Sequence, residues 1–144
     1  MTETEIRSLV DEECVAVNEA TTVGETIETI RDRRSEEATI YYVYVLSEGG
    51  ILTGVVSLRE LLNEADETPV SDAGQSEPVS VTIDESVSDA AETFIRYGFA
   101  ALPVVDTEGE FEGIVRSSEV IDVLDERTAK ELIKDPKRFV PFGD

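Results

Sequence analysis

The 144-residue chain contains no histidine, no tryptophan and a single cysteine, Cys14. One cysteine cannot form a disulfide within the chain, and without histidine there is neither a Cys–His zinc site nor a Cys–His catalytic pair. We therefore interpret Cys14 as a small apolar residue that opens a strand. Acidic residues are abundant, but no histidine, paired cysteine or positioned nucleophile accompanies them, so the sequence does not favour an enzyme.

Long apolar segments are also absent. No apolar run approaches the roughly 20 residues of a membrane-spanning helix, and the acidic first residues are unlike a secretory signal peptide. The chain is therefore expected to be cytoplasmic and not to insert directly into a membrane.

Basic residues are scarce: 12 Lys and Arg stand against 33 Asp and Glu, which gives a formal net charge of −21. Binding to nucleic acid requires a basic face, so the composition argues against a nucleic-acid partner. So many carboxylates repel one another in dilute buffer, whereas molar salt screens charges beyond about 3 Å. The balance is typical of a halophilic protein with a solvated acidic surface.

What the sequence does contain is an internal repeat. Two apolar runs, 42–46 and 101–105, each lead into a four-residue turn that ends on a glycine, Gly50 or Gly109. This pattern predicts two β-hairpins, because glycine readily adopts the positive φ that such turns require. In each copy a second strand, over 51–56 or 111–115, leads into an amphipathic helical segment.

A helix is also predicted before each hairpin. Thr22-x-x-Glu25 and Ser86-x-x-Asp89 have the spacing of a capping box. Apolar residues follow at helical spacing, namely Val23, Ile27 and Ile30 in the first copy and Val87, Ala91, Phe94 and Ile95 in the second. Each copy is then a β-α-β-β-α unit of about sixty residues, and the first carries five extra residues within 31–37. Two such units sharing one core predict an α/β fold.

We divide the chain into a first repeat over 9–66, a connector over 67–78, a second repeat over 79–126 and a C-terminal extension over 127–144. The connector is rich in acids, Pro, Gly and Ser, and 70–73 is expected to form one helical turn. The apolar residues Ile6, Leu9 and Val10 predict a short docking helix near the start.

Polar side chains lie where the second strand of the first copy enters its helix. A helix N-terminus favours phosphate, so Ser57 and Arg59 are candidates to hold a phosphate. The Glu60 carboxylate would accept hydrogen bonds from ribose hydroxyls. The same Ser57-x-x-Glu60 spacing also forms a capping box that needs no ligand, and the residues alone leave both interpretations open.

At these residues the chain resembles a tandem pair of CBS (cystathionine-β-synthase) domains, from about residue 9 to 126. The resemblance rests on the repeated hairpin with LPVVD at 102–106 and on the turns GVVSLREL at 54–61 and GIVRSSEV at 113–120. With TIYYVYV at 39–45 and the five-residue insertion, these segments are most similar to the cytosolic CBS pair of MgtE-type magnesium transporters. The resemblance implies a pseudo-two-fold Bateman-type module that forms a homodimer and has no catalytic activity.

The resemblance also implies that an adenine nucleotide binds in the cleft between the repeats, with ATP the expected ligand and ADP or AMP as alternatives. Carried over by position, Ser57, Arg59 and Glu60 would face Phe99, Ala100 and Ala101, with Tyr42 near the base and Val79 at the cleft floor. Glu60 and Glu119 stand where the family has aspartate. Arg116 stands where it has serine or threonine, so the other cleft, with Tyr41 and Tyr42, is the poorer candidate.

Magnesium is the second expected ligand. Asp122, Asp125 and Glu126 lie on one predicted helix, and pairing of two chains about a two-fold axis would bring acids from both together. Mg²⁺ would relieve their repulsion, because it is satisfied by one or two carboxylates plus water. The alternative is that these acids are merely solvated.

The function implied is that of a ligand-sensing regulator of magnesium transport, with a magnesium-transporter membrane domain as its partner. Two alternatives stay open: a structural dimerisation module without a ligand, and a CBS regulator of an unrelated enzyme or transporter. The transporters' N-terminal and transmembrane domains are not in the sequence. We therefore expect either a separate regulatory module or one part of a longer protein.

Overall fold

The computed structural model describes residues 4–33 and 42–124. The first repeat comprises β1 (Val15–Asn18), α1 (Val23–Arg33), β2 (Tyr42–Leu46), β3 (Leu52–Ser57) and α2 (Leu58–Leu62). The second comprises β5 (Val81–Thr82), α3 (Val87–Tyr97), β6 (Ala101–Val105), β7 (Phe111–Arg116) and a helix over 117–124. The β-α-β-β-α order therefore occurs twice, and the predicted α/β fold is confirmed.

Each repeat builds its own sheet. The first has the order β1-β2-β3-β4, in which the short strand β4 (Gln75–Ser76) comes from the connector, and the second has the order β5-β6-β7. β1 is parallel to β2 and β5 is parallel to β6, whereas both hairpins are antiparallel. Because parallel neighbours need a crossover, α1 and α3 connect the parallel pairs. The connector also forms a 3₁₀ helix (Val70–Asp72), as expected for 70–73.

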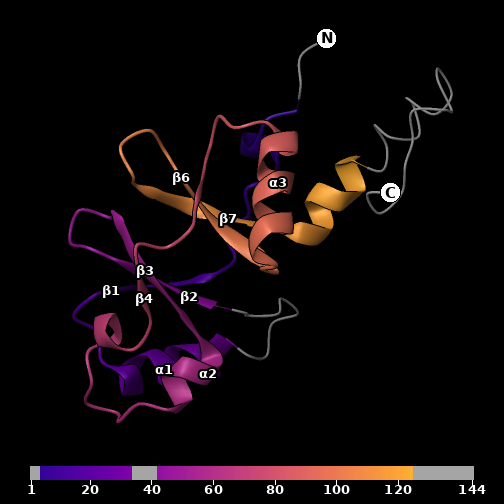
Figure 1. Ribbon diagram of the computed structural model, residues 1–144. Helices are drawn as coiled ribbons and strands as arrows, with labels where there is room; N and C mark the ends of the chain where they lie inside the picture. The colour runs from indigo at the N-terminus through magenta and orange to yellow at the C-terminus, as the bar shows by residue number, and fades with distance from the viewer. Residues whose placement is uncertain (1–3, 34–41, 125–144) are drawn as a thin grey trace, which may run out of the picture.

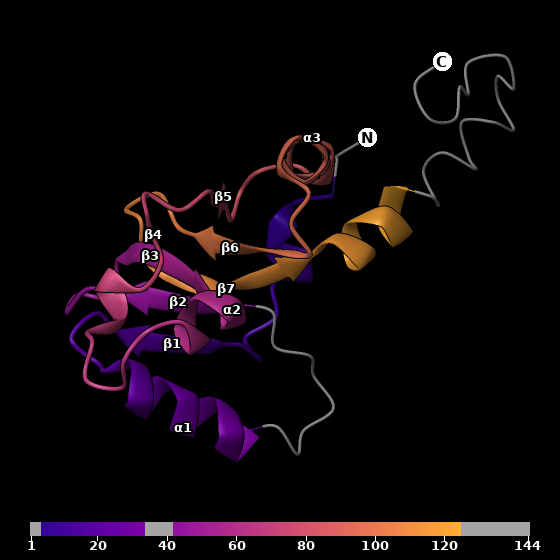
Figure 2. The ribbon, with the colours of Figure 1, turned by 60° about the horizontal axis from the view of Figure 1, so that its bottom comes forward.

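The two sheets lie between the helices. Figures 1 and 2 show α1 and α3 on opposite outer sides of the molecule, with the strands between them. On β2, Val43 and Val45 pack in the core that contains Val23 of α1. Tyr44, between them in sequence, belongs to the cluster that joins the two sheets, with Ala101 and Ile114. Side chains alternate along a strand, so covering both faces buries the whole centre of β2.

The two hairpin tips join the repeats directly. Gly50 and Gly109 have φ values of 82° and 88°, as the predicted turns require. The Leu52 N–H donates to the Gly109 carbonyl at 3.1 Å, and the Phe111 N–H donates to the Gly50 carbonyl at 3.0 Å. This reciprocal pairing fixes one hairpin beside the other.

The N-terminal segment, residues 4–11, packs on the second repeat rather than on the first. It forms a 3₁₀ helix (Ile6–Leu9), and the Ile6 side chain is fully buried in the core beside α3. Asp11 and Ile114 exchange both backbone hydrogen bonds, at 2.8 and 2.9 Å. A Cβ at Gly113, where φ is 149°, would lie 2.7 Å from the Asp11 carbonyl oxygen, so glycine is needed for this close approach.

Not every apolar residue at helical spacing is buried. Ile95 of α3 is 83% exposed, because the buried side of this helix is formed by Val87, Ala90, Ala91 and Phe94. Leu62 and Ile121 are also large exposed hydrophobic residues, at 74% and 54%. Among the residues described, no helix is both long and apolar enough to cross a membrane.

Candidate functional site

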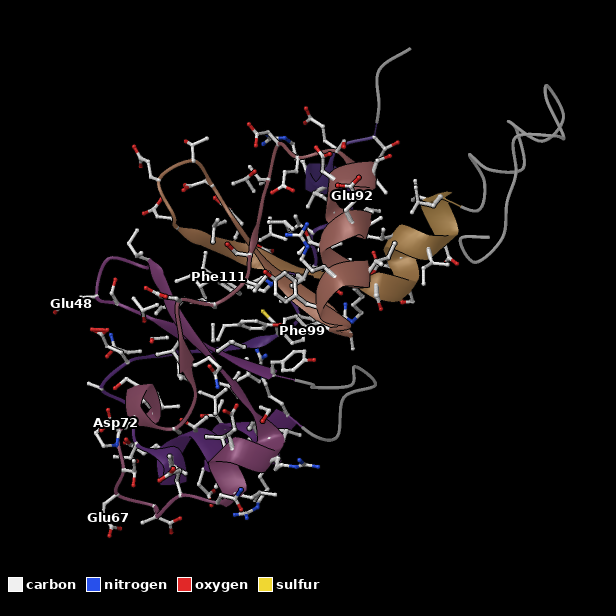
Figure 3. The ribbon with its side chains drawn as sticks, in the orientation of Figure 1. Glu48, Glu67, Asp72, Glu92, Phe99 and Phe111 are labelled. Atoms are coloured by element: carbon white, nitrogen blue, oxygen red, sulfur yellow. The ribbon has the colours of Figure 1, made fainter. Side chains whose placement is uncertain are left out.

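A cleft of about 420 Å³ lies between the two repeats. Its walls come from β2, β3 and the start of α2 on one side, and from the end of α3 and β6 on the other, with the connector contributing as well. The lining residues are Tyr42, Tyr44, Val55, Ser57, Glu60, Gln75, Glu77, Pro78, Val79, Tyr97, Phe99, Ala101, Leu102 and Pro103. Figure 3 shows Phe99 between the two halves of the molecule.

The structure brings six of the eight residues proposed from the sequence into this cleft: Tyr42, Ser57, Glu60, Val79, Phe99 and Ala101. Arg59 does not line it and is exposed. Ala100 is also outside the lining, and its carbonyl accepts a hydrogen bond from the Ser117 N–H at 2.9 Å. Arg59 and Ala100 therefore do not line the cleft as it stands, and their contact with a ligand stays a prediction.

Aromatic rings gather where α3 runs into β6. The rings of Tyr97 and Phe99 are stacked, with centroids 5.8 Å apart and planes 6° apart. Tyr42 meets Phe99 edge-on at 6.0 Å. Tyr97 and Phe99 remain 47% and 37% exposed. Exposed ring faces beside a cleft offer a flat aromatic ligand a surface on which to stack.

Ser57 and Glu60 form the capping box expected from their spacing. The Ser57 hydroxyl accepts from the Glu60 N–H at 3.1 Å, and Oε1 of Glu60 accepts from the Ser57 N–H at 2.9 Å. A hydroxyl that accepts can still donate its own proton, and a carboxylate has a second oxygen. The cap therefore leaves one donor and one acceptor at the cleft, and capping does not compete with ligand binding.

The charged residues that line the cleft are both acidic, the half-buried Glu60 and the exposed Glu77. Glu77 was not proposed from the sequence. Its φ is 59°, and among the described residues other than glycine it alone has a positive φ. Such a conformation is uncommon for a long side chain and disfavoured before proline, which here is Pro78. The connector is thus held in an unusual backbone conformation at the cleft.

In the second repeat the corresponding turn is occupied by the chain itself. The Arg116 guanidinium donates to the Asp11 carboxylate and, at 3.4 Å, to the Glu13 carbonyl. A hydrogen bond from the Glu13 N–H and the Arg116 guanidinium together hold the pKa of Asp11 below its usual value. These contacts tie the N-terminal segment to the end of β7, at the position that corresponds to Ser57 in the first repeat. Tyr41, proposed for this cleft, lies outside the described residues.

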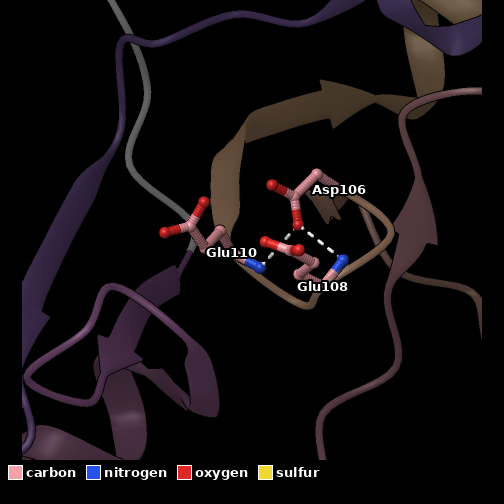
Figure 4. A group of neighbouring side chains, drawn as sticks. All are labelled: Asp106, Glu108 and Glu110. Carbon is pink, nitrogen blue, oxygen red and sulfur yellow. Dashed lines mark hydrogen bonds between the residues drawn. The ribbon is translucent and has the colours of Figure 1, made fainter.

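The proposed metal ligands are only partly described. Asp122 is exposed, and Asp125 and Glu126 lie outside the described residues. Among the described residues, three other acids of the second hairpin place carboxylate oxygens within 4.8 Å of one another (Figure 4), namely Asp106, Glu108 and Glu110.

These three acids have a structural explanation. Oδ1 of Asp106 accepts from the backbone N–H groups of Glu108 and Glu110, at 2.8 and 2.9 Å, and these bonds shape the turn. The bonds, chiefly the one from Glu110, lower the pKa of Asp106, and the charge of Asp106 raises the pKa of Glu110. The cluster is accounted for as the cap of a hairpin.

Cys14 lies immediately before β1, as expected, and packs against the cluster that contains Tyr44. Burial raises the pKa of its thiol to about 11. Because the thiolate is the reactive form, the raised pKa favours the unreactive, protonated thiol at neutral pH.

Comparison with known proteins identifies the family. The model of the CBS domain matches residues 6–67 and 70–126. The chain is 38% identical over 132 residues to the magnesium transporter MgtE of Thermus thermophilus, covering 92% of this chain and 29% of the transporter. It is 34% identical over 119 residues to MgtE of Enterococcus faecalis, covering 83% and 26%. The chain thus spans less than a third of the length of these two relatives.

The structural comparison agrees. The fold matches the crystal structure of the cytosolic domain of the Mg²⁺ channel MgtE in complex with ATP, with a TM-score of 0.79 and 39% identity over 85% of this chain and 49% of that one. It also matches the soluble part of a magnesium transporter, with a TM-score of 0.80 and 32% identity over 88% and 49%. Since the family model matches both repeats, the chain belongs to the CBS domain family, as a tandem CBS pair.

Proposed function

We propose that this CBS pair is a regulatory module that binds an adenine nucleotide in the cleft between its repeats. The observation that carries the proposal is the exposed aromatic group of Tyr97, Phe99 and Tyr42 at a cleft that also presents Ser57 and Glu60. A purine base is flat and stacks on aromatic rings, with about 1–3 kcal/mol per base from such contacts. Ribose hydroxyls would donate to the remaining oxygen of Glu60.

ATP is the favoured nucleotide. The similar MgtE cytosolic domain, 39% identical, was crystallised in complex with ATP. The Ser57 hydroxyl can donate to a phosphate oxygen. Arg59 lies next to Glu60 in sequence, is exposed and forms no ion pair with any residue of 4–33 or 42–124, so its guanidinium is available to a phosphate beyond the cleft lining.

We propose magnesium transport as the regulated process, because the two relatives described above, 38% and 34% identical to this chain, are magnesium transporters. In this proposal the module has no catalytic activity, lies in the cytoplasm and acts with a transporter membrane domain. The exposed Leu62 and Ile121 favour a homodimer, since large apolar side chains are better buried against a second copy. Asp122, Asp125 and Glu126 are proposed to bind Mg²⁺ between two copies.

Titration calorimetry with ATP, ADP and AMP in molar KCl tests the nucleotide proposal. Saturable binding to the parent chain, weakened about tenfold or more by Phe99→Ala through lost stacking, is the expected result. Ile95→Ala, which truncates an exposed residue of the neighbouring helix, serves as the control and should bind like the parent. If none of the three nucleotides binds, the cleft is not a nucleotide site.

Small-angle scattering with sedimentation, in MgCl₂ and in KCl of equal ionic strength, tests the magnesium proposal. A dimer whose dimensions respond to Mg²⁺ beyond the effect of ionic strength is expected. A dimer indifferent both to Mg²⁺ and to nucleotides would instead support a purely structural dimerisation module.

A further inference from the structure

The charged residues of the cleft are negative, and so are the phosphates of the proposed nucleotide. Glu60 and Glu77 are its two charged lining residues, and no lysine or arginine is among the side chains that line it. Glu60 already serves the capping box, with one oxygen bound to the Ser57 N–H. Glu77 makes no hydrogen bond or ion pair within the described part of the chain, so its carboxylate has no internal counter-charge.

The backbone on both sides fixes where Glu77 lies. Just before it, Ser76 of β4 pairs with Gly54 of β3, and a few residues after it, Val81 of β5 pairs with Val104 of β6. Glu77 spans the step between the two sheets with a φ of 59°, followed by Pro78. A disfavoured backbone conformation persists only where the surrounding structure imposes it. Here the strand pairing on both sides of Glu77 imposes it and keeps the residue at the cleft. The connector thus presents an acid at a defined position on the ligand side.

We propose that Glu77 makes the cleft select among adenosine ligands by the charge of their tail. The charge of Glu77 lowers the affinity for free polyphosphate tails, but not for neutral tails or for phosphate tails paired with a divalent cation. A like charge about 6 Å away in a water-exposed site weakens binding by roughly threefold, and by more where water is excluded. The repulsion grows with the number of phosphates near Glu77. The net charge of −21 on the protein adds to it.

The inference rests on the proposed nucleotide function and deepens it. If free ATP is disfavoured and the Mg²⁺ complex of ATP is accepted, occupancy of the cleft rises with the Mg²⁺ concentration even without a metal-binding residue in the cleft. Occupancy of the cleft would then depend on the Mg²⁺ concentration as well as on the nucleotide concentration.

The test is calorimetry with adenosine, AMP, ADP and ATP, each with excess EDTA or with MgCl₂, at the lowest salt that keeps the protein folded. Without Mg²⁺ the parent should bind ATP more weakly than it does with MgCl₂, whereas its affinity for adenosine should not depend on MgCl₂. Glu77→Gln should strengthen Mg²⁺-free ATP binding about three- to tenfold, with adenosine unchanged within about twofold. Glu77→Lys should extend the gain, and molar KCl should reduce it.

Glu67→Gln is the matched control. It removes the same charge from an equally exposed acid of the same connector, but Glu67 does not line the cleft and lies far from Phe99 in Figure 3, so the ATP-to-adenosine ratio should not change. An unchanged ratio in Glu77→Gln, with melting temperatures equal to that of the parent, would overturn the proposal while leaving the nucleotide site intact. If neither adenosine nor any nucleotide binds to the parent, both the nucleotide function and the selectivity fall.

Discussion

Arg59 is the proposed phosphate-binding side chain, because it is basic and lies next to Glu60 of the capping box. A charge-assisted contact to phosphate contributes about 1.5–3 kcal/mol. Arg59→Ala should therefore weaken ATP binding about ten- to a hundredfold, with adenosine binding and melting temperature nearly unchanged. Calorimetry measures this, with Arg31→Ala of α1 as the control for a lost exposed arginine. Equal ATP affinity in Arg59→Ala and parent would remove Arg59 from the site.

Asp11 and Arg116 carry a pH-dependent part of the stability. The folded pKa of Asp11 lies below its ordinary value of 3.8, chiefly because the Glu13 N–H donates to it, with Arg116 adding to the effect. A carboxylate with a lowered folded pKa stabilises the fold above its unfolded pKa. That contribution is lost as the pH falls through the folded value.

Asp11→Asn should therefore lower the free energy of unfolding at neutral pH by on the order of 1 kcal/mol, as for a partly exposed ion pair. The difference from the parent should shrink as the pH is lowered below 3.8. Urea denaturation across the pH range measures it, and Asp72→Asn, at an exposed acid, is the control. A difference that does not depend on pH would show that the lost charge is not the cause.

At the level of the elements, the N-terminal segment contributes to stability by packing on the second repeat, as a docking helix would. Ile6 is fully buried in the core of the second repeat. Ile6→Ala should lower the free energy of unfolding by about 2–5 kcal/mol, as for other buried Ile-to-Ala changes. Urea denaturation in molar KCl measures it, against Ile95→Ala, whose exposed side chain should cost little. Similar small losses in both variants would contradict the packing described.

The hairpins could be predicted because their signals are local. The apolar runs predicted strands over 42–46 and 101–105, which are the bounds of β2 and β6, and both turn glycines have positive φ. β4 could not be predicted in this way. Gln75 and Ser76 have no strand pattern of their own, and they pair with Val55 and Gly54 about twenty residues earlier.

The candidate site was predictable to the extent that it follows a motif. Ser57 and Glu60 are three residues apart and therefore share a helix face, whereas Arg59 is turned by roughly 200° from Ser57 and leaves the cleft. Tyr97 joins Phe99 because Gly98 ends α3 with a φ of 70°, a geometry that periodicity does not reveal. The Asp11–Arg116 pair joins residues 105 positions apart and had no local signal.

For the whole molecule, the net charge of −21 predicts that salt stabilises the fold. Screening of repulsion among carboxylates acts first, and salt strengthening of apolar burial adds to it at higher concentration. The melting temperature, followed by circular dichroism, should therefore rise with KCl or NaCl into the molar range. A melting temperature that is flat or falls over this range would contradict the acidic-surface interpretation.

The crossing of the N-terminal segment onto the second repeat gives the molecule a mechanical property. Residues 4–11 are bonded to Val87 and Ile114, and only afterwards does the chain enter β1 of the first repeat. Tension applied at Thr4 is therefore transmitted first to the repeat that is more distant in sequence. A pull on the N-terminal segment therefore loads the cleft wall formed by β6 and the end of α3 before it loads the wall formed by β2 and β3.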